Sequence, residues 1–133
     1  MGAYRDNSKE ILSKHWQLVN LWRPLKTVHK NPLAVADSST VPISDQHIIA
    51  YERSLPTGQV YSVENYFTKG TNADKHQWYY LSQQKPEEVL VFKIYDSDEK
   101  AKAPGSTHTS FLDPRTEDMP TRESIELRCV LAY

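Results

Sequence analysis

The sequence lacks several features that mark common protein classes. It has one cysteine, Cys129, which excludes a disulfide framework and fits a reducing compartment. No apolar run approaches the length of a membrane span, and the N-terminus has no apolar signal core. The net charge is −1, and the basic residues form no stripe. We therefore expect a cytoplasmic protein with no nucleic-acid partner and no membrane partner.

Recognisable metal-binding motifs are also missing. A common non-haem iron site uses two histidines and one carboxylate, and its first pair is usually His-x-Asp or His-x-Glu on one strand. None of the five histidines has a carboxylate two positions later. H-E-x-x-H and paired cysteines are absent as well, which excludes zincin and zinc-finger sites.

The length and composition of the sequence favour one soluble globular domain covering 1–133. Hydrophobic residues make up 38% of the 133 residues and charged residues 25%. Three Trp and eight Tyr are many for so short a chain. Such residues line ligand cavities, but they also favour β-rich packing, and composition leaves both interpretations open.

The residue pattern predicts a mainly β fold with a short N-terminal helix and long loops. The helix is expected over 4–14, with Asn7 as its N-cap. A single helical turn is expected at 86–88, after Pro86, and 40–56 is ambiguous between strand and helical turn. Short strands separated by turn-rich loops are typical of a sandwich or an open barrel. Strands are expected at 15–23, 33–36, 59–67, 78–81, 89–95, around His108, and at 122–132.

The residues suited to bind a metal ion or a carboxylate lie near the C-terminus. His108 is near the start of a short strand, and Arg122 and Ser124 share one face of the next strand. An Arg fork beside a hydroxyl is suited to hold a carboxylate. Spacing alone favours a plainer arrangement, in which one set of alternating side chains faces water and the other faces the core. The water-facing set would be Arg122, Ser124, Glu126 and Arg128, and the core-facing set Ile125, Leu127, Cys129 and Leu131.

Lys93 stands alone among apolar residues in the strand expected at 89–95. A lysine in that position must reach water, an acidic partner or a ligand, because an unpaired buried charge is costly.

Six motifs occur in an order known from one protein family: NLWRPL at 20–25, NPLAVADS at 31–38, HQWYY at 76–80, EVLVFKIYDS at 88–97, HTSF at 108–111 and RESIELR at 122–128. On these motifs the sequence resembles the AsaB-like hydroxylase/desaturase family. That family is common in fungal secondary metabolism and is related to the small subunit of bacterial cephem methoxylation. The resemblance runs from about residue 15 to the C-terminus, and residues 1–14 match only a helical lead-in.

The resemblance implies an oxygenase that uses Fe(II) and 2-oxoglutarate on a small-molecule substrate. It also implies a jelly-roll-like, partial double-stranded β-helix. His108 would be the distal iron ligand, and Arg122 and Ser124 would clamp 2-oxoglutarate. Further positions that match family motifs, and are candidates for cofactor binding, are Arg23, Tyr79, Tyr80 and Lys93.

One part of the family pattern is missing. Family members carry a His-x-Asp segment upstream of the Trp-Arg-Pro motif, and this sequence starts after that point. The resemblance therefore implies the C-terminal portion of the fold, with one iron ligand of three, and weak or absent turnover by this chain alone. Two alternatives stay open: a non-catalytic binding or partner subunit, and a truncated gene model. Because early strands would be missing, we expect exposed edges covered by a homodimer or a partner subunit, or else poor solubility.

Overall fold

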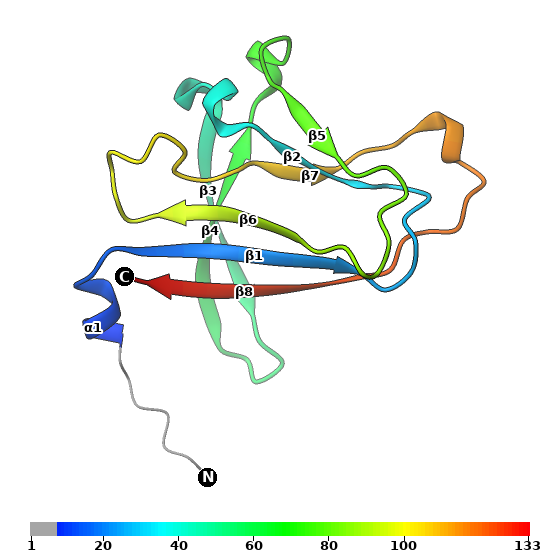
Figure 1. The fold of residues 1–133 in the computed structure, drawn as a ribbon. Helices are drawn as coiled ribbons and strands as arrows, with labels where there is room; N and C mark the ends of the chain where they lie inside the picture. Colours follow the sequence, from blue (N-terminus) through cyan, green and yellow to red (C-terminus); the bar gives the residue numbers. More distant parts are fainter. Residues whose placement is uncertain (1–7) are drawn as a thin grey trace.

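The computed structural model describes residues 8–133, except for three side chains in β4, and contains two antiparallel sheets and a separate two-stranded ribbon (Figure 1). The first sheet has the order β6 (Leu90–Asp96), β1 (Trp16–Pro24), β8 (Ser124–Ala132). The second has the order β5 (Trp78–Tyr80), β2 (Leu33–Ala36), β7 (His108–Ser110). The ribbon pairs β3 (Gln46–Ser54) with β4 (Val60–Thr68). The remaining elements are the helix α1 (Ser8–Leu12) and the 3-10 turns η1 (Ser38–Thr40), η2 (Ile43–Asp45), η3 (Gly70–Asn72) and η4 (Pro114–Thr116).

The predicted mainly β fold with a short N-terminal helix is confirmed, with three local differences. The helix is shorter than expected, and its predicted cap Asn7 lies outside the described residues. The ambiguous 40–56 segment forms β3. The helical turn expected at 86–88 is wrong: the Glu88 amide donates to the Lys85 carbonyl at 3.0 Å, and this closes a turn just before β6.

The hydrophobic core lies between the two three-stranded sheets. Trp22 of β1, Phe92 of β6 and Leu33 of β2 are each at least 93% buried and form one cluster with Val28. Side chains of this size stabilise a fold by about 1.5–3 kcal/mol each when fully buried. Residues that share a sheet face with Trp22 or Phe92 therefore point toward this core.

The alternation of β8 is the reverse of the pattern that spacing alone favoured. Glu126 lies opposite Trp22 and Arg128 opposite Asn20, so both charged residues share the face that carries Trp22, although both remain exposed to water as expected. Asn20 is completely buried, donates to Glu126 Oε1 at 2.7 Å and accepts from Arg128 Nε at 3.2 Å. These bonds satisfy its amide and explain why polar side chains of β8 turn inward. The outer face carries Ile125, Leu127 and Leu131, all exposed, and Cys129, which was expected to be buried and is partly exposed.

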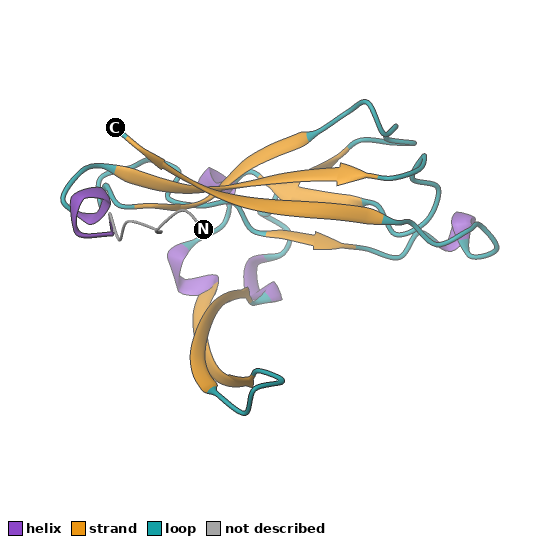
Figure 2. Cartoon of the chain, turned by 90° about the horizontal axis from the view of Figure 1, so that it is seen from below, coloured by secondary structure: helices purple, strands orange, loops and turns teal. Residues whose placement is uncertain are grey.

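The β3–β4 ribbon projects away from the two sheets (Figures 1 and 2), and its base is held by a buried carboxylate. Asp45 is 2% exposed and accepts from Asn72 Nδ2 at 2.9 Å and His76 Nε2 at 3.0 Å. Burial acts to raise the pKa of Asp45, but the hydrogen bonds from Asn72 and His76 outweigh it and leave the pKa below its ordinary value. The amide of Lys69 also donates to the Asp45 carbonyl at 2.8 Å, which brings the two ends of the ribbon together.

Lys93 lies on the outer face of β6, opposite Val19, and pairs with the buried carboxylate of Asp96. The same carboxylate accepts from His15 Nε2 at 2.7 Å and Gln17 Nε2 at 2.9 Å. The hydrogen bond from Lys93 is the largest of the effects that lower the pKa of Asp96. Of the environments predicted for Lys93, the structure therefore contains the acidic partner.

Candidate functional site

His108 faces the core from the second sheet. It lies opposite Val35 on β2, and Val35 packs against the core cluster. The centroid of the imidazole is 4.6 Å from that of the Phe92 ring. His108 Nδ1 is 3.2 Å from the Ser106 carbonyl, so the tautomer protonated at Nδ1 donates to that oxygen and leaves Nε2 with a free lone pair. Metal-binding histidines commonly have this arrangement, because the second hydrogen bond fixes the ring.

Arg122 approaches the same core from the start of β8. Its guanidinium carbon lies 5.3 Å from the centroid of the Trp22 ring, and Nη1 donates to the Asn31 carbonyl at 2.6 Å. Burial lowers the pKa of Arg122, and none of the acidic side chains that the structure describes pairs with it. A partly buried cation without a carboxylate partner favours binding of an anion.

Two further residues are close to Arg122, one along the chain and one through its carbonyl. Ser124, two residues after Arg122, is partly buried and sits opposite Pro24, on the face that also carries Trp22. Asn31 has a φ of +54°, a left-handed conformation that asparagine tolerates better than most residues. Its side-chain oxygen Oδ1 is buried and has no hydrogen-bond partner in the described part of the chain. That orphaned acceptor leaves a place for a ligand hydroxyl or a water molecule.

The fold therefore brings His108 and Arg122 to one interior. The first contacts Phe92 and the second contacts Trp22, and these two aromatic rings belong to one core cluster. The Asn31-Pro32 turn was recognisable in the sequence as a turn. Its role as an acceptor for Arg122 was missed, because a backbone carbonyl leaves no signal in a sequence pattern.

The other candidate cofactor-binding residues are divided among different surfaces. Tyr79 lies opposite Val35, in one row with His108, and is 60% exposed. Tyr80, the next residue on β5, points to the other face of the second sheet. Its ring makes an edge-to-face contact with Phe111, with 5.0 Å between the ring centroids. Arg23 and Lys93 are on the outer face of the first sheet, where Arg23 Nε donates to the Pro86 carbonyl at 2.7 Å. The structure brings Tyr79 to the side of His108, but not the other three residues.

The remaining histidines do not complete a metal site. Among the side chains that the structure describes, no group of three His, Cys, Asp or Glu could hold a metal ion. His76 bonds to Asp45 and His15 to Asp96, while His47 lies on β3. Only the single ligand His108 therefore fits an iron site in this part of the chain.

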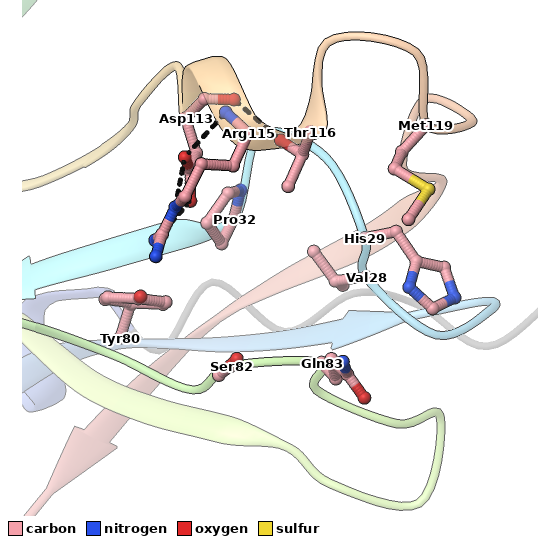
Figure 3. A pocket seen from close by; sticks show the side chains of 10 residues that line it. All are labelled: Val28, His29, Pro32, Tyr80, Ser82, Gln83, Asp113, Arg115, Thr116 and Met119. Atoms are coloured by element: carbon pink, nitrogen blue, oxygen red, sulfur yellow. Dashed lines mark hydrogen bonds and ion pairs between the residues drawn. The ribbon is translucent and has the colours of Figure 1, made fainter.

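A separate hollow of about 290 Å³ lies between the loop that contains His29, the turn after β5 and the loop before β8 (Figure 3). Its arginine, Arg115, forms a bidentate ion pair with Asp113, in which Nη2 lies 2.7 Å from Oδ2. The hydrogen bond from Arg115 lowers the pKa of the Asp113 carboxyl. Because this cation is already neutralised, the hollow carries no free positive charge for an anion, and it includes neither His108 nor Arg122.

Comparison with known proteins identifies the family of the chain. A family model described as an oxidoreductase/YMDC permease-like domain matches residues 2–132. The chain belongs to this family. Despite the word permease in that description, no helix in the described part of the chain is long and apolar enough to cross a membrane.

The curated relatives confirm the AsaB-like resemblance. The hydroxylase/desaturase asaB of Aspergillus flavus is 37% identical over 95% of this chain, which corresponds to 59% of that protein. The α-ketoglutarate-dependent dioxygenase phiK of a fungal species is 36% identical over 94% of the chain and 45% of its own length. The chain thus spans about half the length of the curated relatives it matches.

Solved structures confirm the jelly-roll-like fold. The iron and α-ketoglutarate-dependent endoperoxidase NvfI aligns with a TM-score of 0.79 and 30% sequence identity, over 98% of this chain and 46% of that one. A W199F variant of the same enzyme aligns with a TM-score of 0.78 and 47% of its chain covered. Nearly all of this chain therefore corresponds to slightly less than half of a folded relative.

Proposed function

We propose that this chain forms the C-terminal part of an Fe(II)- and 2-oxoglutarate-dependent oxygenase that hydroxylates or desaturates a small molecule. The observation that carries the proposal is Arg122, a partly buried guanidinium against Trp22 that has no acidic partner among the described side chains. The printed names of the relatives, which describe dioxygenases dependent on α-ketoglutarate, support this class of co-substrate.

In this proposal the far carboxylate of 2-oxoglutarate binds to Arg122 and Ser124. The guanidinium donates through the N–H groups that Asn31 does not use, and the Ser124 hydroxyl donates to the second oxygen. The ring of Trp22 holds the guanidinium from one side and shields it from water, which strengthens the ion pair.

His108 would supply one iron ligand through Nε2, with Nδ1 anchored on the Ser106 carbonyl. The other two ligands are not among residues 8–133, and no His-x-Asp or His-x-Glu pair occurs in the sequence. They would come from the part of the family fold that this chain does not span. When bound, iron would activate O₂, the oxidant, for attack on a C–H bond of the substrate, and 2-oxoglutarate would be oxidised to succinate in the same turnover.

The proposal has two consequences for the whole chain. Residues 1–133 would form a single folding unit that needs a polypeptide partner for catalysis, and turnover by this chain alone would be weak or absent. The single cysteine also favours a cytoplasmic location.

Calorimetric titration of 2-oxoglutarate in the absence of iron tests the clamp. We expect Arg122→Ala to weaken binding at least tenfold, because the carboxylate loses its charged donor. The matched control is Arg23→Ala, which removes an arginine from the outer face of the same sheet. Equal binding by the wild type and Arg122→Ala would remove the basis of the proposal.

Succinate formation with Fe(II) and 2-oxoglutarate tests catalysis. We expect little or none from the isolated chain. Turnover should appear when the remaining part of the relative asaB is added, and His108→Ala should abolish it while His29→Ala leaves it unchanged. Robust turnover by the isolated chain that His108→Ala abolishes would contradict the expected dependence on a partner.

A second candidate function is a non-catalytic 2-oxoglutarate-binding subunit. It is favoured by the contrast between a clamp that this chain can form alone and a metal site of which it contains one ligand. Binding of 2-oxoglutarate that depends on Arg122, without turnover under any of these conditions, would support that alternative.

A further inference from the structure

The outer face of the first sheet is an exposed apolar surface. Val91, Leu21 and Leu127 lie side by side across β6, β1 and β8, on the face opposite Trp22. Val91 is 63% exposed and Leu127 is 61% exposed. Along β8 the surface continues to Ile125, which is 52% exposed, and to Leu131, at 42%. Contiguous apolar surfaces of this kind usually mark a contact with another polypeptide.

Two charged groups border this surface. Lys93 is neutralised by its pairing with Asp96, whereas Arg23 donates only to the Pro86 carbonyl and keeps its positive charge at the exposed rim. The surface therefore offers apolar contact with one cation at its edge, which fits a partner with an apolar face and a polar rim.

The same sheet also ends in a strand that, in the described part of the chain, is paired along one edge only. β8 has nine residues and is the terminal strand next to β1, and β7 is likewise terminal in the second sheet. A terminal strand of this length presents backbone N–H and C=O groups on its free edge that another strand can pair with.

The comparison with NvfI indicates what covers this surface. Ninety-eight per cent of this chain aligns with 47% of a folded relative at a TM-score of 0.78. The rest of that relative belongs to the same molecule and must pack against the shared half. We propose that the outer face of β6-β1-β8, together with the free edge of β8, binds a polypeptide that carries the half of the family fold absent from residues 1–133. This inference rests on the proposed function, because the same polypeptide would bring the iron ligands that His108 lacks.

A second copy of this chain fits the observations less well. It would bring no His-x-Asp or His-x-Glu pair, since none occurs in the sequence. Pairing of β8 with β8 of another copy would cover the two edges but leave the row of Val91, Leu21 and Leu127 exposed. A complementary half can cover both the edge and the face.

The test is a binding measurement without iron or 2-oxoglutarate. Residues 1–133 are mixed with the part of Aspergillus flavus asaB upstream of the segment that aligns with this chain. Complex formation is followed by sedimentation velocity and by calorimetric titration. We expect a one-to-one complex, and we expect Leu127→Lys and Val91→Lys each to weaken it at least tenfold, because a charge then has to be buried at the contact.

The matched control is Leu112→Lys, which changes an 80% exposed leucine in the loop after β7. It should leave the affinity unchanged, and thermal melting should show that all three variants stay folded. Absence of a complex, or a complex that neither face variant weakens, would overturn the proposal. Self-association that Leu127→Lys abolishes would instead assign the surface to a second copy. Because these measurements involve neither cofactor nor turnover, their failure is distinct from a failure of 2-oxoglutarate to bind at Arg122.

Discussion

At the residue scale, the pairing of β1 with β6 determines what Lys93 can do. Phe92 lies opposite the buried Asn20 and points into the core, so the next side chain, that of Lys93, points outward. There it meets Asp96 three residues later. The family motif made Lys93 a candidate for cofactor binding, whereas its position makes it a structural residue that neutralises a buried carboxylate.

The substitution Lys93→Met separates these two roles. We expect the melting temperature to fall by roughly 3–6 °C, because Asp96 loses its charged partner while the apolar stem is kept. Binding of 2-oxoglutarate should not change. Calorimetric melting together with titration of 2-oxoglutarate checks both expectations, and loss of binding at unchanged stability would return Lys93 to the co-substrate site.

At the element scale, strand positions were predictable and the faces of strands were not. β2 and β6 follow from short apolar runs bounded by turn signals. The orientation of β8 was missed because its polar residues alternate as they would on a solvent-facing strand. The decisive partner, Asn20, lies 106 residues from Glu126 in the sequence, and no local pattern reports such a contact.

The β3–β4 ribbon depends on its base, because a two-stranded ribbon has little stability of its own. Asp45→Ala removes the acceptor for Asn72 and for the buried His76. We expect the melting temperature to fall by roughly 5–10 °C and amide exchange in β3 and β4 to accelerate.

Asp37→Ala provides a matched control for that change. Asp37 also accepts from a backbone amide, that of Ser39, but its carboxylate is exposed at the start of η1. Its removal should cost less stability and leave exchange in the ribbon unchanged. If hydrogen exchange measured by mass spectrometry showed the same protection of β3 and β4 in Asp45→Ala as in the wild type, the buried carboxylate would not be what holds the ribbon.

At the scale of the whole molecule, the order of six motifs was enough to predict the family and the class of fold. The missing His-x-Asp segment predicted a partial metal site, and that remains a prediction. The sequence did not predict which side chains form the exposed outer surface. Leu127 reads as a core residue in a strand pattern, and only the pairing of β8 with β1 shows that it lies on the opposite side.

The stability of the whole chain should depend on pH through its two buried carboxylates. The pKa values of Asp45 and Asp96 are both lowered from an ordinary value of 3.8, through hydrogen bonds from Asn72 and His76 in the first case and chiefly from Lys93 in the second. The folded state therefore binds these protons less readily than the unfolded state. Their stabilising contribution is present above about pH 4 and is lost as the pH falls through the lower folded-state values.

Urea unfolding at about pH 7, 5 and 3 checks this dependence in the wild type and in the double variant Asp45→Asn/Asp96→Asn. We expect the variant to be less stable at the two higher pH values and the difference to begin to shrink at the lowest, where the carboxylates of the unfolded wild type become protonated while that of Asp96 stays ionised in the folded state. Asp118→Asn, at an exposed position, should follow the wild type throughout. A difference of constant size at all three pH values would mean that the two carboxylates act through shape and packing, and that the ionic bonds of Asp45 and Asp96 do not set the acid stability of the fold.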